Sequence, residues 1–503
     1  MGYLAQTERA TRELDAAVLR AALATCAPEL VEPAASTYAG LGALFKLRAD
    51  VADQLRLTSD FGGGDFLEMR ELRDLAHFAS LASTVPALIA RLSVDSRYDS
   101  VVRELRAGQT STLPWAVAMR EARASVARQF ATTPSEQTLK RDVAMTRPPS
   151  QRIGARLGDP EPDRATRLQS EPLARAPEVP TVDEVCAEPL GDDAEDLGDG
   201  LLGDGAWWLA LHRFGKLDSR STQLERARLA SCAGQGRDGS ALHTPPWRLG
   251  EDGFSADQCR ANDRRWLGIA PPGVMALARC EACGQAFKEG RDDGPNVRAA
   301  HLAACSSAHK GESQSHGSLP VFNTNHTMLR SALRACAVEV LGDDFVEEEL
   351  SGGVAGSQMR PGDVTLYVST HTVAVDVTIV YMQTPSNCHT QAENPGTPVM
   401  REEAAKRRKY AEVEFTDACT KFVPFAVDDF GHIGDSGWAL LEQLAAHGAA
   451  KTRGKDFTKG RTEAEIRSHY LTTWQQRIAH AVRSSVDRSM QRRLALSRRH
   501  LTT

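Results

Sequence analysis

Apolar residues recur at helical spacing along the first 130 residues of the chain and predict a helical region there. One stripe consists of Leu14, Val18, Leu19, Ala22 and Leu23. A second stripe consists of Leu67, Leu72, Leu75, Phe78, Leu81, Val85 and Leu88. Residues three and four positions apart share one face of a helix, so each stripe would form a buried helix face. Three consecutive glycines, Gly62 to Gly64, interrupt the helical pattern between the stripes and indicate a turn.

The pattern changes to that of β-strands between residues 360 and 380. Two runs rich in β-branched residues, 364–368 and 373–380, are separated by a short polar turn and together predict a β-hairpin. Because side chains alternate between the faces of a strand, Val375 and Val377 point to one face and Asp376 to the other. A carboxylate in such a strand is costly to bury unless it is paired or binds a metal.

Two helices and a further strand are predicted after the hairpin. The run 401–410 has good helix composition and carries Lys406 and Tyr410 four positions apart on one face. An apolar run at 422–427 predicts a strand, and 436–446 predicts the second helix. The order of elements is that of a mixed sheet flanked by helices.

Two more helices are predicted at the ends of this region. Asn325, His326 and Thr327 would cap a helix that includes Val338 and Val340. Near the C-terminal end of the sequence, apolar residues recur at every fourth position and predict a long amphipathic helix: Ile466, Tyr470, Trp474, Ile478, Val482, Val486, Met490 and Leu494. Nine arginines against three acidic residues in 461–503 could contact phosphates or form a solvated face.

Composition is that of an ordinary globular protein large enough for two to four domains. The 503 residues are 41% hydrophobic and 25% charged, with a net charge of −6, so any nucleic-acid surface must be local. We expect no transmembrane helix and no signal peptide. Ten scattered cysteines favour a reducing compartment over a disulfide framework. These features predict a nuclear or cytoplasmic protein without membrane partners.

Residues 131–205 are expected to be a disordered linker. Prolines are frequent there and apolar periodicity is missing. From Ala176 to His212 the sequence contains acidic residues but no lysine or arginine. Low hydropathy combined with charge of one sign favours disorder and would repel nucleic acid.

A candidate zinc site lies between these regions. Cys280 and Cys283 form a CxxC motif followed by glycine, and His301 and Cys305 stand four positions apart. On a helix, the latter two would face the same side, completing a tetrahedral Cys₃His set. His309 and His316 are alternative ligands, and the competing interpretation is a free CxxC with a core cysteine. Four protein ligands would make the site structural rather than catalytic.

Several of these motifs, taken in order, resemble a known nuclease family. Pro361-x-Asp363, then Asp376-Val-Thr, then a helix with Lys406-x-x-Lys409-Tyr410 is similar to the restriction-like endonuclease of certain non-LTR retrotransposons, a divergent branch of the PD-(D/E)xK superfamily. Most of that superfamily has a lysine two residues after the second acid, whereas this branch takes its lysine from the following helix. The resemblance covers residues 320–450.

The resemblance implies a metal-dependent nuclease that nicks DNA to prime reverse transcription. Asp363 and Asp376 would hold a catalytic Mg²⁺, and Lys406 would stabilise the developing charge or position the nucleophile. Lys409 is the alternative lysine, and Tyr410 would support it from the same helix end. The implied cofactors are Mg²⁺ and structural Zn²⁺, and the implied partners are DNA, element RNA and a separate reverse transcriptase.

The glycine turn at 62–64 is similar to the turn that precedes the thumb helices of reverse transcriptase in the same elements. The Tyr-x-Asp-Asp or Phe-Ala-Asp-Asp motif of a polymerase palm is missing from the sequence. We therefore expect no polymerase activity, and the chain looks like the C-terminal half of a retroelement reading frame. Alternatives are a catalytically inactive, decayed or domesticated nucleic-acid-binding module, and an unrelated host α/β protein.

The expected fold class is α+β and multidomain. Six regions are predicted: helical and thumb-like (1–130), an acidic, proline-rich linker (131–205), a helical connector (206–275), a zinc-knuckle-like segment (276–318), an α/β restriction-like endonuclease core (319–450) and a basic amphipathic helical tail (451–503).

Overall fold

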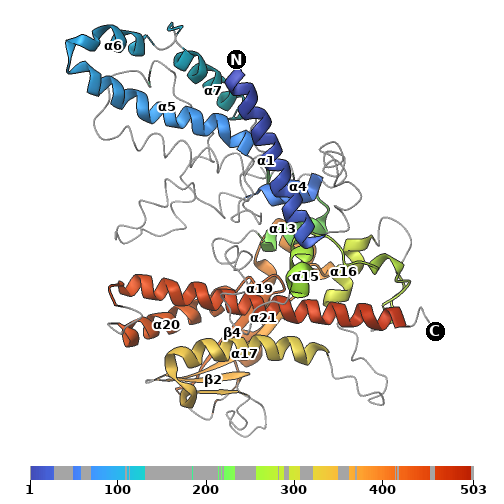
Figure 1. Ribbon diagram of the computed structural model, residues 1–503. Helices are drawn as coiled ribbons and strands as arrows, with labels where there is room; N and C mark the ends of the chain where they lie inside the picture. The colour runs from blue at the N-terminus through green and yellow to red at the C-terminus, as the bar shows by residue number, and fades with distance from the viewer. Residues whose placement is uncertain are drawn as a thin grey trace. The chain divides into compact units, whose positions relative to one another are not determined.

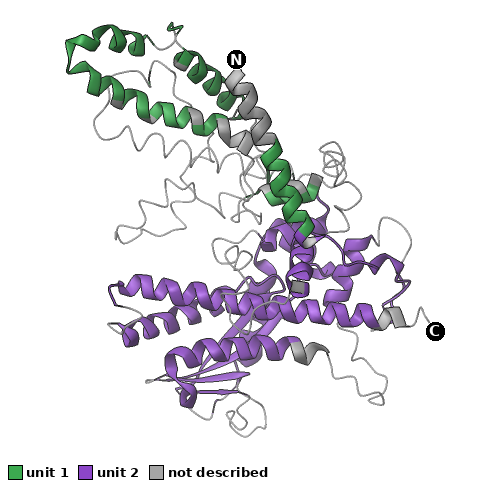
Figure 2. Cartoon of the chain, viewed as in Figure 1, with its two compact units in different colours: residues 1–24, 28–220 green, residues 25–27, 221–503 purple. Residues whose placement is uncertain are grey.

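The computed structural model divides the chain into two compact units, 1–24 with 28–220 and 25–27 with 221–503 (Figure 2). Apart from a few single positions, the residues that it describes are 2–27, 49–57, 69–107, 110–112, 114–130, 220–232, 256–280, 283–287, 294–305, 321–348, 362–368, 371–413, 419–453 and 459–499. The protein is mixed α/β, mostly helical, with one small four-stranded sheet. The predicted linker and the glycine turn lie outside the described residues, apart from one position in the linker.

The first unit is helical, as its apolar periodicity predicts. Its described helices are α1 (Gly2–Cys26), α4 (Ala49–Arg56), α5 (Met69–Ser93), α6 (Asp99–Arg106) and α7 (Pro114–Phe130), with the short 3₁₀ turn η3 (Ser96–Tyr98). The stripes are only partly internal, because Leu14 is 51% exposed and Leu88 40% exposed. By length and composition alone, Asp74–Leu92 in α5 would suffice to cross a membrane, but core helices pass the same test. Phe78 and Ile89 of this stretch are buried within the unit.

The sheet of the second unit contains the predicted hairpin and the predicted following strand. Its strands lie in the order β1 (Val346–Glu348), β2 (Val364–Val368), β3 (His371–Val380) and β4 (Lys421–Asp428). The pairs β1–β2 and β2–β3 are antiparallel, and β3–β4 is parallel. A parallel neighbour requires a crossover connection. Here the crossover carries α18 (Pro385–Glu393) and α19 (Thr397–Tyr410).

Each face of the sheet packs against different helices. Val375, Val377 and Phe425 belong to a large core cluster shared with α17 (Val321–Leu341) and α20 (Asp435–Thr452). On the opposite face, Ala426 packs in a smaller cluster with Val399 of α19. This packing confirms that Val375 and Val377 lie on the core side, as the period-two alternation predicts. Asp376 then lies on the side of α19.

Helix α21 (Glu463–Arg499) is the predicted long amphipathic helix, and it is a central element of the second unit. Its 37 residues span about 55 Å. Thr462 and Glu465 form a reciprocal capping box at its start. The eight residues of the apolar stripe are all buried, and Ser484 and Ser485 on other faces are buried too. Figure 1 shows α21 running beside α20, which it contacts.

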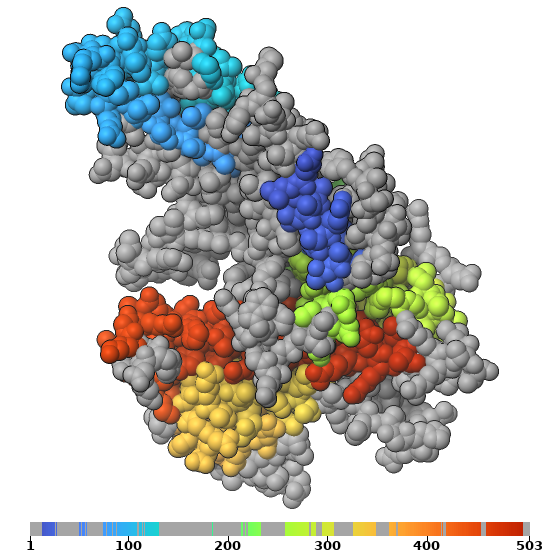
Figure 3. Space-filling view, viewed as in Figure 1, coloured from blue at the N-terminus to red at the C-terminus, as the bar shows by residue number. Residues whose placement is uncertain are grey.

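The segment from α13 (Gln223–Cys232) to α16 (Pro295–Ala304), which precedes the sheet region in sequence, packs against the C-terminal half of α21 through α15 (Ala256–Trp266) and α16. Helix α13 packs on α18, and the 3₁₀ turn η5 (Val274–Ala276) lies between α15 and α16 in sequence. Met490 and Leu494 of α21 share an apolar cluster with Leu302. Arg493 is buried and donates to the main-chain oxygens of Leu302 and Ala303. Figure 3 shows the yellow-green part of this segment lying against the dark red end of α21.

The helix predicted to begin at Asn325 begins earlier, at Val321. Asn325 therefore does not cap the helix. Its side chain instead donates to the Tyr381 hydroxyl and accepts from the Ser489 hydroxyl. A polar residue can make such tertiary bonds from a helix interior, and sequence spacing alone does not distinguish them from capping.

Gly448 is placed where α17, α20 and α21 meet. A Cβ atom there would lie 2.5 Å from Val340 Cγ1 and 3.1 Å from Tyr470 Cε2. We expect Gly448→Ala to lower the free energy of unfolding by about 1–3 kcal/mol through overpacking, although alanine favours a helix by about 1 kcal/mol. Urea titration of the full chain followed by circular dichroism measures this. The control Gln443→Ala, at an exposed position of α20, should change stability by less than about 0.5 kcal/mol.

Candidate functional site

The hairpin brings Asp363 and Asp376 to one place. Asp363 directly precedes β2, and Asp376 stands in the middle of β3. The main-chain N–H of Asp363 donates to Val375 O at 2.7 Å, and Val377 N donates back to Asp363 Oδ2 at 2.8 Å. The two carboxyl groups share a hydrogen bond. Two acidic residues that are distant in sequence therefore form one pair, in which Asp376 is buried and Asp363 is partly buried.

Gly362 makes this close approach possible. A Cβ atom at this position would lie 2.7 Å from Val375 O and 2.9 Å from Val375 N. Such contacts with main-chain atoms cannot be relieved by moving a side chain. Only glycine lets the chain pass this close to β3 just before Asp363.

Helix α19 places a lysine ammonium group against the acidic pair. Lys406 Nζ donates to Asp376 Oδ2 at 2.8 Å. The buried Glu403, one turn earlier, accepts from the main-chain N–H of Ser436 at 3.1 Å and from its hydroxyl at 2.8 Å. Ser436 lies in the first turn of α20, so Glu403 caps that helix and anchors α19. This anchor fixes the position from which Lys406 reaches Asp376.

Tyr410 completes the cluster, and Lys409 lies outside it. The Tyr410 ring is buried and stacks on Phe422 with a centroid separation of 4.1 Å. Its hydroxyl hydrogen-bonds with Asp376. Lys409 is exposed, and its Nζ lies 4.9 Å from the Tyr410 ring centroid. Of the two lysines expected from the sequence, Lys406 contacts the acidic pair directly.

The two carboxyl groups have unequal electrostatic environments. Burial and the hydrogen bond with Asp363 raise the pKa of Asp376, and Lys406 offsets them only in part. Burial also acts to raise the pKa of Asp363, but the hydrogen bonds and charge around it, with His326 foremost, outweigh burial and lower that pKa. Burial and the two carboxylates raise the pKa of Tyr410 to about 12. The pair is therefore arranged to share a proton or to bind a cation.

Sequence reasoning missed the contact that His326 makes. His326 lies on α17, and its Nε2 is 3.1 Å from Asp363 Oδ2. The sequence expectation for this residue was helix capping, but it stands inside the helix. A lone histidine 37 positions before its partner carries no local signal of such a contact.

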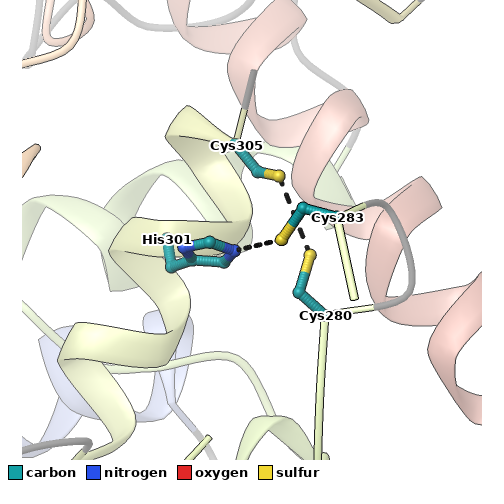
Figure 4. Close-up of side chains that lie close together, drawn as sticks. All are labelled: Cys280, Cys283, His301 and Cys305. Carbon is teal, nitrogen blue, oxygen red and sulfur yellow. Dashed lines mark hydrogen bonds between the residues drawn. The ribbon is translucent and has the colours of Figure 1, made fainter. Parts of the chain in front are cut away.

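The predicted zinc ligands form a cluster of Cys280, Cys283, His301 and Cys305 (Figure 4). Their ligand atoms all lie within 4.8 Å of one another. The distance from Cys280 Sγ to Cys305 Sγ is 3.8 Å, and that from Cys283 Sγ to His301 Nε2 is 3.3 Å. Tetrahedral Zn²⁺ would require about 3.8 Å between sulfurs and about 3.6 Å between sulfur and nitrogen. The cluster could therefore bind a metal such as zinc.

The main chain around the cluster has a knuckle geometry. Gly284, at a φ of 73°, donates its N–H to Cys280 O at 2.7 Å, and Cys280 N donates to Gln285 O at 2.8 Å. His301 packs edge-on to Phe287, and Cys305 ends helix α16. His309 and His316, the alternative ligands, lie outside the described residues.

The arginines of α21 only partly form the expected outer face. Arg483 and Arg493 are buried and donate to the main-chain oxygens of Phe430 and Leu302. Arg488 and Arg492 are exposed. Because α21 is covered on several sides, some of its arginines serve the interior of the unit. A helical wheel cannot distinguish these two uses of arginine.

Comparison with known proteins adds no identification. No family model matches the chain, and no curated protein sequence matches it.

Zinc binding can be tested by substituting one ligand. We expect the purified full chain to contain about one zinc and Cys280→Ser to lose it, because three ligands hold zinc much more weakly than four. Elemental analysis of the purified protein measures this. Cys388→Ser is the matched control, since Cys388 lies in α18 outside the cluster and should leave the zinc content unchanged. An intact chain that is folded yet free of zinc would contradict the assignment.

Proposed function

We propose that this chain is a metal-dependent DNA endonuclease related to the restriction-like enzymes of non-LTR retrotransposons. The observation that carries the proposal is the meeting of Asp363, Asp376 and Lys406, which come from the start of β2, the middle of β3 and helix α19. Two carboxyl groups that can hold a divalent cation, with a lysine beside them, can support hydrolysis of a phosphodiester.

The acidic pair suits a hard divalent cation. Carboxylate oxygens are the ligands that Mg²⁺ prefers in proteins. Burial raises the pKa of Asp376 beside Asp363, which means that the surroundings do not fully stabilise a negative charge on both carboxyl groups. A cation shared by the two residues would remove this conflict. Bound Mg²⁺ would polarise the scissile phosphate and lower the pKa of a bound water.

Lys406 and Tyr410 would act from α19. The Lys406 ammonium lies against Asp376, where it can stabilise negative charge that develops on a phosphate held at the pair. Tyr410 has a raised pKa, keeps its proton and hydrogen-bonds with Asp376. Both residues depend on the anchor that Glu403 makes with α20.

Exposed basic residues beside the pair support DNA as the substrate. Arg407, Arg408 and Lys409 are exposed in the last turn of α19, directly after Lys406. The chain as a whole has a net charge of −6, so this local patch would provide the phosphate contacts. We further propose that nicking primes reverse transcription by a separate polymerase, in the nucleus or cytoplasm. Element RNA would then be a second partner.

The first test of this function is Asp376→Asn. Loss of a metal ligand should reduce nicking of supercoiled DNA in Mg²⁺ or Mn²⁺ to background, while DNA binding, which depends on basic residues elsewhere, is retained. Nicking is followed on agarose gels and binding by fluorescence anisotropy. Glu347→Gln is the control, because this carboxylate lies on the edge strand β1, bonded to Tyr367, and should keep full activity.

The Asp376→Asn substitution should also affect the stability of the fold. The pKa of Asp376 is raised in the folded chain, so its ionisation destabilises the fold as pH rises from about 4 through the folded value. Asparagine cannot ionise and still accepts from Lys406. The metal-free variant should therefore be at least as stable as the wild type at neutral pH.

A wild-type chain that binds DNA but never nicks it would favour the inactive binding module.

The lysines give a second test. Lys406→Ala should lower the nicking rate at least about 100-fold, since it removes charge stabilisation at the reacting phosphate. Lys409→Ala should have a smaller effect, because Lys409 contacts the Tyr410 ring and not the acidic pair. Single-turnover rates of the two variants decide between them. The reverse order of effects would assign the catalytic role to Lys409.

A further inference from the structure

We propose that His326 is a positioning residue for the acidic pair. In this role it holds one oxygen of Asp363 so that the other oxygen is available for the cation shared with Asp376. The inference rests on the proposed metal-dependent function and adds a residue from α17 to it. His326 thereby becomes a part of the site that the nuclease-like motifs do not include.

Two contacts to one oxygen of Asp363 support this role. Its Oδ2 accepts from Val377 N at 2.8 Å and lies 3.1 Å from His326 Nε2. An ionised carboxylate only accepts hydrogen bonds, so Nε2 carries the proton in this contact. A carboxylate oxygen has two lone pairs, and both on Oδ2 are used. Oδ1 takes part in neither contact, so it is the oxygen left for the bond with Asp376 or for a cation that replaces the shared proton.

Helix α17 holds His326 in a fixed place. Leu329 and Leu333, on the next turns, are fully buried in the main core. The neighbouring Asn325 bonds to both Tyr381 and Ser489, which ties this part of α17 to the end of β3 and to α21. A donor held this firmly orients the carboxylate without having to be ordered when metal binds.

Packing does not account for a histidine here. The His326 side chain is 38% exposed, whereas Asp363, which it contacts, is 18% exposed. A half-exposed position can accept many residues without loss of the fold. Its specific feature is an N–H directed at a candidate metal ligand. Partners that hydrogen-bond to ligating groups typically contribute 10–100-fold to metal affinity or activity.

The test measures Mn²⁺ binding by the zinc-loaded full chain, using isothermal titration calorimetry. We expect His326→Ala to raise the Kd for Mn²⁺ about 10–100-fold. His326→Gln places an amide N–H near the position of Nε2 and should restore affinity to within a few-fold of the wild type. His389→Ala is the control, because His389 also faces a carboxylate, Glu393, but on α18 away from the pair. Circular dichroism verifies that each variant is folded.

The outcomes separate this inference from the proposed function. Wild-type affinity in folded His326→Ala overturns the positioning role. Affinity in His326→Gln as weak as in His326→Ala also overturns it, since the ring nitrogen would then ligate the metal itself. If the wild type and variants bind Mn²⁺ in the expected order of affinity but the wild type nicks no DNA, the endonuclease proposal is overturned and the role of His326 stands. Wild-type protein that binds no Mn²⁺ overturns both.

Discussion

The second unit is organised around a carboxyl group that must be buried in a strand. Asp376 belongs to β3, whose other face packs against the main core, so its side chain lies between the sheet and α19. A buried carboxyl needs hydrogen bonds or an opposite charge. Lys406 and Tyr410 from α19 and the carboxyl of Asp363 provide them. The hairpin, the parallel crossover and the placement of α19 therefore act together to give the buried Asp376 its partners.

Helix α21 connects this arrangement to the metal-ligand cluster. Its N-terminal half packs in the main core through Trp474, which also donates to Glu339 of α17. Its C-terminal half packs on the cluster through Met490 and Leu494. The zinc-knuckle-like segment thus shares a unit with the sheet, and a metal held there would stabilise the same helix that packs on α17 and α20.

Several features could be predicted because their signals are local. Strands β2 and β3 are evident from β-branched runs bounded by turns, and β4 from an apolar run. The cysteine ligands were evident because a knuckle needs two thiols within one turn of chain. The central position of α21 was not predictable from its apolar stripe. That stripe shows one buried face, whereas Ser484 and Ser485 are buried by neighbours that sequence spacing cannot locate.

The sequence by itself determined the chemistry available to this protein: an acid at a strand start, an acid inside a strand, basic residues on a helix, and a Cys₃His set. Only the tertiary structure decided which of them meet. It brought Lys406 to Asp376 and left Lys409 at the surface, although both are on α19. It also brought His326 to Asp363 from a different helix. Spacing along a chain specifies faces of single elements, whereas distances between elements depend on packing across the whole unit.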